Sequence, residues 1–396
     1  MIWVFRLPFF DDNNVFIIFQ KVNIVKIVIA TDSFKESLTA PQACAAIQRG
    51  FAKIAPNVQY VQVPMADGGE GTAAALVSAC GGEWVNVRVS DPLGRQVLAK
   101  YGVLPNGTAV MEMAEAAGLH LLTLAERNLM KTSTYGVGEM IADALGRGIK
   151  RIILGIGGSA TNDGGAGMAQ ALGFRLLDKA GRDLPRGGAA LRYLAAVNMS
   201  SSLYELDGCE IVVACDVVNP LCGDSGASAV FGKQKGANTQ MIRELDTALT
   251  NFADVLARNG TDFRDEAGSG AAGGLGFGLR ALLGAQLRSG IDIVLEITEL
   301  ANKISGADLV ITGEGCMDGQ TTFGKVPLGV LRVAQEYGVP VVGLAGSVAD
   351  VDELYALGFA AVFPSIDRVA SLPDVLANAE QNVERTARAI AAIWAL

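Results

Sequence analysis

The chain has 396 residues, of which 50% are hydrophobic, and this is enough for two globular domains that each bury a core. Its formal net charge of -9, from 41 acidic and 32 basic residues, argues against binding to nucleic acid or another polyanion. The six cysteines form no C-x-x-C pair, and the only histidine, His120, lies in an apolar stretch, which disfavours a His-dependent triad and a multi-histidine metal site.

The first 25 residues differ from the rest of the chain. Residues 1–10 and 15–19 are apolar, but Arg6 and Asp11 interrupt this region, so no run reaches the ~20 apolar residues of a membrane-spanning helix. The acidic residues and the lack of a small-residue cleavage site fit a signal peptide poorly. We therefore predict that residues 1–25 are an extension outside the fold, and that the protein is cytoplasmic.

From Lys26 onward, short β-branched runs alternate with helical patterns, which is typical of a parallel sheet with helices on both faces. Thr39 can cap the first helix, and Pro56 ends it. Strands of this kind are predicted at both ends of the chain, at residues 26–30, 58–63, 307–312, 339–344 and 360–363.

The middle of the chain has a different pattern. Residues 84–89 and 108–113 alternate like half-exposed strands, and turn sequences lie between them, which favours a mixed sheet. We predict a two-domain α/β protein. A Rossmann- or flavodoxin-like parallel-sheet domain is built from both chain ends, residues 26–67 and 291–396, and a mixed α/β domain is inserted at residues 68–290.

Polar residues follow the predicted parallel strands, at the edge where open sheets of this kind bind ligands. Any one acid could be a turn residue or a helix cap, but several acids and lysines at one edge indicate a ligand site. The residues that follow the first three strands are Asp32, Ser33 and Lys35, then Asp67 and Glu70, then Glu314 and Asp318.

Two glycine-rich loops in the predicted inserted domain add further candidates. Residues 157–165 (GGSATNDGG) follow a predicted strand and precede a helix, so their N–H groups and the helix start could hold an anion such as phosphate. Residues 268–276 (GSGAAGGLG) have the same character, although tight backbone packing explains such glycines equally well. Asp216 ends another strand, predicted at residues 211–214.

A dinucleotide-binding pattern is present in part. Gly155, Gly157 and Ala160 follow a strand, and Asp178 lies about 20 residues beyond the second glycine. The pattern lies in mid-chain, however, and the residues after Asp178 are those of a surface turn. A nicotinamide-dependent oxidoreductase is therefore a remote alternative.

A Walker A pattern is also incomplete. Gly319, Gly324 and Lys325 have the right spacing, but Val326 stands where Ser or Thr would hold magnesium. Lys325 could still reach a phosphate from the start of the next helix.

Six segments together resemble the type-1 glycerate kinase family, in collinear order from Lys26 to the C-terminus. They are TDSFKESLTA from Thr31, ADGGEGT from Ala66, GGSATNDGGAGMAQALG from Gly157, CDVVNPLCG from Cys215, FGKQKGA from Phe231 and ADLVITGEGCMDGQTTFGKVPLGV from Ala307. Thr31 stands where the family usually has proline. The resemblance implies ATP-dependent phosphorylation of D-glycerate, at the 2-hydroxyl, by two domains that close over a cleft.

For phosphoryl transfer, a carboxylate has to accept the hydroxyl proton, and oxygen ligands have to hold Mg²⁺. We expect Asp67 or Asp163 to be the base, and Lys35 and Lys325 to neutralise the acceptor carboxylate and the transferring phosphoryl group. Asp216, Glu314 and Asp318 are the candidate magnesium ligands. The candidates for substrate or phosphate binding are Asp32, Ser33, Glu70, Gly157, Gly158, Ser159, Thr161, Asn162, Gly273 and Gly274.

Several alternatives stay open at this point. The product could be 3-phosphoglycerate, the acceptor could be another small hydroxy acid or a sugar, and a non-catalytic binding protein could use the same cleft. The partners expected are a small-molecule substrate and a nucleotide, with neither nucleic acid nor membrane. The sequence determines neither the oligomeric state nor the domain that holds the nucleotide.

Overall fold

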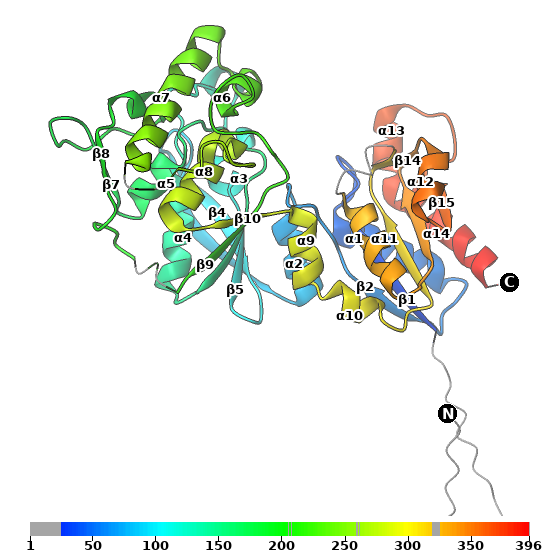
Figure 1. The fold of residues 1–396 in the computed structure, drawn as a ribbon. Coiled ribbons are helices and arrows are strands. Elements are labelled where there is room, and N and C mark those ends of the chain that lie inside the picture. The colour runs from blue at the N-terminus through cyan, green and yellow to red at the C-terminus, as the bar shows by residue number, and fades with distance from the viewer. Residues whose placement is uncertain are drawn as a thin grey trace, which may run out of the picture.

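A computed structural model describes residues 25–395, except positions 205, 207, 259, 261 and 319–324. The predicted extension at residues 1–25 lies outside the described residues apart from Val25. The described chain forms two large sheets with helices around them (Figure 1). None of its helices combines the length and the apolar character needed to cross a lipid bilayer.

The first large sheet has five parallel strands, which come from both ends of the chain. Their spatial order is β15 (Ala361–Pro364), β13 (Val341–Ala345), β11 (Leu309–Gly313), β1 (Lys26–Thr31) and β2 (Gln59–Gln62). In the register of β1 with β11, Thr31 lies beside Gly313, so both strands end at the same edge. The five strands predicted for this sheet are confirmed, each to within two residues at the start and one at the end.

Helices cover both faces of the five-stranded sheet. They include α1 (Ala40–Ala52), α10 (Leu300–Ile304), α11 (Val326–Glu336), α12 (Val351–Leu357), α13 (Leu372–Ala377) and α14 (Ala379–Trp394). Ile27 and Ile29 of β1 pack with α1 and α14, whereas Val28 and Ala30 pack in a separate core with α11. Successive side chains of a strand point to opposite faces, so this fully apolar strand fits a sheet that is buried on both sides.

The first helix begins where the sequence predicts. The Thr39 side chain accepts a hydrogen bond from the N–H of Gln42 at 3.4 Å, and the Gln42 side chain accepts one from the N–H of Thr39 at 2.9 Å. This reciprocal capping box satisfies backbone donors that would otherwise lack partners at the helix start.

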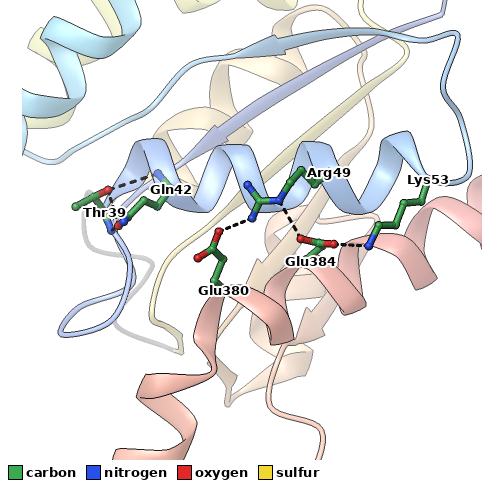
Figure 2. A network of polar contacts seen from close by, with 6 residues as sticks. All are labelled: Thr39, Gln42, Arg49, Lys53, Glu380 and Glu384. Atoms are coloured by element: carbon green, nitrogen blue, oxygen red, sulfur yellow. Dashed lines mark hydrogen bonds and ion pairs between the residues drawn. The ribbon is translucent and has the colours of Figure 1, made fainter.

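A network of ion pairs joins α1 to α14, which follows it by more than three hundred residues (Figure 2). Arg49 contacts Glu380 at 2.5 Å and Glu384 at 2.9 Å, and Lys53 contacts Glu384 at 2.5 Å. Exposed pairs of this kind contribute little to stability, about 0–1 kcal/mol each. The apolar contacts beneath them hold the two ends of the chain together.

The second large sheet has six strands, all from the middle of the chain. Their spatial order is β10 (Gln286–Arg288), β9 (Glu210–Ala214), β6 (Arg151–Gly155), β5 (Thr108–Glu112), β4 (Gln96–Val103) and β3 (Glu83–Ser90). The first four are parallel to one another, and β4 and β3 are antiparallel to their neighbours. The predicted mixed sheet is therefore confirmed, as is the two-domain α/β fold class.

Helices also cover both faces of the six-stranded sheet. On one face are α3 (Ala114–Ala117), α4 (Tyr135–Gly146), α5 (Ala166–Ala171), α7 (Thr239–Ala257) and α8 (Ala271–Leu283), around the largest apolar core. The other face is covered by α2 (Thr72–Cys80) and α9 (Gly290–Ile297). Shorter elements of the described chain are α6 (Ala227–Phe231), β7 (Arg175–Leu177), β8 (Ala196–Asn198), β12 (Cys316–Met317), β14 (Ser347–Val348), η1 (Leu119–Leu121), η2 (Leu124–Glu126), η3 (Gly188–Tyr193) and η4 (Lys233–Lys235).

The two large sheets share one apolar core. Figure 1 shows α2 and α9 between the sheets, and a single buried cluster contains residues of both helices, Val28 and Val310 of the five-stranded sheet, and Val110 and Ile153 of the six-stranded sheet. The domain boundaries at residues 67/68 and 290/291 stay a proposal, and the origin of the strands in each sheet supports it.

Candidate active site

Three carboxylates meet at the carboxyl end of the five-stranded sheet. Asp32 follows β1, Glu314 follows β11, and Asp67 follows an extension of β2 in which Met65 donates to the Thr31 carbonyl at 2.9 Å. Burial, followed by the charges of Asp67 and Glu314, raises the pKa of Asp32 to about 7. Asp32 is therefore near enough to both Asp67 and Glu314 for their charges to disfavour its ionised form.

Replacing Asp32 with asparagine is expected to raise the melting temperature in magnesium-free buffer by a few degrees at about pH 8, and by less at about pH 5. The pKa of Asp32 is about 7 in the folded protein and 3.8 in the reference state, so the folded protein binds more protons between these values. Stability present at low pH is therefore lost as the pH rises through 7, and the asparagine variant escapes this loss. Thermal unfolding at both pH values measures the effect, with the exposed Asp352→Asn as control. An equal shift at both pH values would contradict the expected coupling.

The loop that carries Asp67, residues 66–71, crosses from the edge of one large sheet to the edge of the other, and we call it the crossing loop. Gly68 has a φ of 94°, and a Cβ there would lie 2.8 Å from Gly290 and 2.9 Å from Ala214, the last residue of β9. A Cβ on Gly290 would in turn overlap the Asp67 carbonyl oxygen. Glycine at both positions thus lets the backbone of this loop pass directly over the end of β9 and the start of α9.

Two acids of the six-stranded sheet hold the crossing loop and the neighbouring helix start. Glu112, at the end of β5, accepts hydrogen bonds from the N–H groups of Gly71 and Ala73 at the start of α2. Asp216, after β9, accepts one from the N–H of Gly290 at 3.2 Å. Burial is the largest cause that raises the pKa of Asp216, and the charge of Asp67 adds to it. Asp67 therefore lies between Asp32 on one side and Asp216 on the other.

The predicted glycine-rich loop at residues 157–165 lies beside the crossing loop. A Cβ on Gly157 would be 3.6 Å from the Cα of Gly69, which brings the two loops into contact. Leu119 donates to the Gly158 carbonyl at 2.9 Å, and Ala160 donates to the Ala117 carbonyl at 2.8 Å. Gly157 and Gly158 are exposed, and the chain then turns inward.

Asp163 is fully buried and lies at the centre of this loop. Its carboxylate accepts hydrogen bonds from the Thr134 N–H at 2.8 Å, the Thr134 hydroxyl at 3.0 Å, and the N–H groups of Gly165 and Gly167 at 3.2 Å. Burial raises its pKa, while the N–H donors oppose the shift. The N–H groups at this helix start are thus engaged by a carboxylate of the protein itself, and Asp163 has no exposed surface in this structure.

Thr161, Asn162, Gly273 and Gly274 are also buried, and they pack against one another. A Cβ on Gly273, whose φ is 68°, would overlap the Thr161 carbonyl oxygen, and Gly164 donates to the Gly273 carbonyl at 3.0 Å. These residues form the buried side of the loop at residues 157–165. For the glycines, tight backbone packing is the interpretation that the structure favours.

The two predicted lysines lie at the edge that carries Asp32 and Glu314. Lys325 precedes α11, and its Nζ is 3.8 Å from the Glu314 carboxylate. Lys35 is exposed on a turn in which Phe34 donates to the Leu38 carbonyl, and a Cβ on Gly315 would be 3.3 Å from its backbone nitrogen. Most of the Walker-like segment, residues 319–324, lies outside the described residues.

The remaining predicted side chains lie around this edge. Ser33 is half-buried and its N–H donates to the Asp32 carboxylate at 2.5 Å, while Glu70 is exposed in the crossing loop. Asp318 directly follows β12, with one carboxylate oxygen 3.8 Å from the Cys316 sulfur. Across the described residues, no group of three or more His, Cys, Asp or Glu side chains is close enough to form a metal site, so Asp216, Glu314 and Asp318 are not gathered as one ligand set.

The dinucleotide alternative finds no support in the position of Asp178. Its backbone N–H donates to the Arg182 carbonyl at 2.9 Å, and its side chain accepts from the N–H groups of Ala180 and Arg182. This is the surface turn expected from the sequence. His120 lies exposed on η1, with its ring packed over Gly118.

Sequence reasoning missed one charged residue at this site, Lys235. It is 4% exposed, and its Nζ donates to the Ser159 hydroxyl oxygen at 2.6 Å and to the Thr161 carbonyl at 3.0 Å. Burial lowers its pKa to about 7, and the charge of Asp163 opposes this shift. Its segment, FGKQKGA, was noticed only as part of the family resemblance.

Comparisons with known proteins agree on one family. The sequence profile described as "Glycerate kinase family" matches residues 27–395. A glycerate kinase of Bacillus subtilis is 50% identical over 371 residues, covering 93% of this chain and 97% of the relative, and a glycerate 2-kinase of Escherichia coli is 48% identical over 375 residues, covering 94% and 98%. A crystal structure described as a glycerate kinase 2 from Salmonella typhimurium LT2 superposes with a TM-score of 0.87 at 51% identity, covering 94% of this chain and 98% of that one.

Proposed function

The chain belongs to the glycerate kinase family, and from this membership we propose that it transfers the γ-phosphoryl group of ATP to the 2-hydroxyl of D-glycerate, giving 2-phosphoglycerate. The observation that carries the assignment of the site is the crossing loop, which holds Asp67 beside acids of both large sheets. Cytoplasmic location is part of the proposal, and the six free cysteines support it.

Asp67 is the proposed general base. Its carboxylate accepts a hydrogen bond from the N–H of Gly69 at 3.1 Å and is half-buried, so it is held in place and still open to a ligand. A hydroxyl group bound at the crossing loop would give its proton to this carboxylate as the oxygen attacks phosphorus. We assign no such role to Asp163, because it is buried and its oxygens are engaged by N–H and O–H donors.

The charges at the edge of the five-stranded sheet suit the two anions that react. We propose that Lys35 pairs with the carboxylate of glycerate and Lys325 with the transferring phosphoryl group, because ammonium groups stabilise both kinds of oxygen. Ser33 and Glu70 flank this edge and stay candidates for contact with the hydroxyl groups. The exposed residues Gly157 and Gly158 on the opposite loop are candidates for a second anion site, through their backbone N–H groups.

The same edge fits Mg²⁺ by the chemistry of its donors. Mg²⁺ in phosphoryl-transfer enzymes is held by one or two carboxylates, together with water and the phosphates of the substrate. Asp32 and Glu314 supply oxygen donors, and burial, then the charge of Asp67, then that of Glu314 raise the pKa of Asp32. We propose these two as the ligands, with Asp318 after β12 as a further candidate, and leave Asp216 to orient α9. When bound, the ion would neutralise charge on the phosphates.

The proposed reaction is tested by ADP release in a coupled assay. D-Glycerate, L-glycerate, other small hydroxy acids and sugars are compared with ATP and Mg²⁺ present and with Mg²⁺ removed by EDTA. Phosphorus–proton correlation by NMR then locates the phosphate, which couples to one methine proton at C2 or to two methylene protons at C3. Coupling to the methylene group would replace the proposed product by 3-phosphoglycerate, and faster turnover of another acid would replace the acceptor.

Replacing Lys35 with alanine is expected to raise the KM for glycerate about tenfold or more, because a charged hydrogen-bond partner of a carboxylate contributes about 1.5–3 kcal/mol. The KM for ATP should change much less. Steady-state kinetics with each substrate varied in turn measures both values. Lys53→Ala is the matched control, since this lysine lies on α1 and pairs with Glu384 instead (Figure 2). An unchanged KM for glycerate would remove Lys35 from the acceptor site.

A further inference from the structure

The mechanism above leaves one charged residue without a role, the buried Lys235. It ends η4, and its ammonium lies beneath the exposed tip of the loop at residues 157–165. Its two hydrogen bonds, to the Ser159 hydroxyl oxygen at 2.6 Å and to the Thr161 carbonyl at 3.0 Å, both end on this loop. A lysine that is 4% exposed is rare unless it is paired, and its position therefore calls for an explanation.

The direction of the hydrogen bond between Lys235 and Ser159 is fixed by chemistry. An ammonium group has three donors and no acceptor, so the Ser159 oxygen accepts and the hydroxyl proton has to point elsewhere. Among the described residues, the contact with Lys235 is the hydrogen bond made by the Ser159 hydroxyl. Ser159 is 6% exposed, and the residues before it, Gly157 and Gly158, form the exposed tip of the loop. Its proton is therefore available for a second hydrogen bond.

The charge of Lys235 is partly balanced from below. Asp163 is the charged group that acts on Lys235, and its oxygens are engaged by the N–H groups of Thr134, Gly165 and Gly167. These N–H donors already stabilise much of the negative charge of the Asp163 carboxylate. The ammonium therefore also polarises the Ser159 hydroxyl, as charge-assisted hydrogen bonds do.

We propose, resting on the function proposed above, that Lys235 is a positioning residue that acts through Ser159. Its ammonium turns the Ser159 hydroxyl outward, where it donates to an anionic oxygen of a substrate at the loop of residues 157–159. The ligand chemistry is a carboxylate or phosphate oxygen. The carboxylate of the hydroxy acid and a phosphate of the nucleotide are the two sources.

Kinetics of four variants test the proposal. Ser159→Ala is expected to raise one of the two KM values roughly tenfold, and which of them rises identifies the source of the anion. Lys235→Met should raise the same KM. In the double variant this KM should be no higher than in Ser159→Ala, because Lys235 then has no hydroxyl to act through. Lys233→Met, which removes an exposed lysine of the same turn, should leave both KM values unchanged. The proposal would be overturned if the two increases in KM multiply in the double variant. It would also be overturned if Lys233→Met raises the same KM by as much as Lys235→Met.

A second measurement serves if Lys235→Met does not fold or if the proposed reaction fails. Sulfate keeps its charge near neutral pH, so its affinity for the protein, measured by calorimetry, reports the anion site without any turnover. Because the pKa of Lys235 is about 7, affinity should fall several-fold from about pH 6 to about pH 8 as the ammonium loses its proton. The fall should be absent in Ser159→Ala and kept in His120→Asn, which controls for the exposed imidazole nearby. A fall of equal size in Ser159→Ala would overturn the inference, whatever the enzyme phosphorylates.

Discussion

Replacing Asp67 with asparagine is expected to lower kcat by about 10² or more, with the affinity for the nucleotide preserved. Asparagine has nearly the same shape and can still accept the hydrogen bond from the Gly69 N–H, so the crossing loop should keep its path. It cannot take a proton from the acceptor hydroxyl. Loss of one charge from a crowded acidic edge should also leave the fold at least as stable as before.

Single-turnover kinetics and nucleotide titration separate these effects. The matched control is Asp292→Asn, because Asp292 also acts on the pKa of Asp216 but lies on α9 and contacts Arg332 at 3.9 Å. Its turnover should be near normal. Turnover of Asp67→Asn within a few-fold of the wild type would remove Asp67 as the base and return the question to the other acids of this edge.

Replacing Asp163 with asparagine is expected to act mainly on stability, with a loss of about 3–5 kcal/mol. The amide nitrogen cannot accept the hydrogen bonds that the second carboxylate oxygen receives from Thr134 and Gly167. Lys235 also loses the charge that opposes the lowering of its pKa. A melting temperature lower by roughly 10 °C is the expected result. At low temperature, the fraction that is folded should keep substantial turnover.

Asp178→Asn is the control for this second variant. Asp178 also accepts two backbone N–H bonds, but its turn is exposed to solvent, so the same substitution should cost far less. Differential scanning calorimetry compares the two. If Asp163→Asn melts no lower than Asp178→Asn while its turnover falls a hundredfold, Asp163 is a catalytic group after all, and the loop has to open for it to act.

The elements of the fold could be predicted because their signals are local. A short apolar strand such as β1, buried on both faces, reads as an unbroken β-branched run, and Thr39 marks a helix start by its own side chain. The polar residues after these strands could be found for the same reason. Parallel topology alone brings Asp32 and Glu314 to one edge.

The depth of each side chain could not be predicted, because it depends on contacts between distant segments. Asp67 and Asp163 both follow a strand in a glycine-rich loop, but Asp163 is buried, and Thr134, which lies far from it in the sequence, donates to its carboxylate. Lys233 and Lys235 are two residues apart in the same short segment, and one is exposed while the other is buried. No local pattern distinguishes the members of these pairs.

The origin of the five-stranded sheet in both chain ends also sets the order in which the protein can be made. On the ribosome, β1 and α1 emerge first, whereas their partners β11 and α14 are translated after the whole six-stranded sheet. At about 5–20 residues per second, β11 is translated on the order of 10 s or longer after β1, with which it pairs. All strands of the six-stranded sheet are therefore available to pair before the five-stranded sheet can be completed.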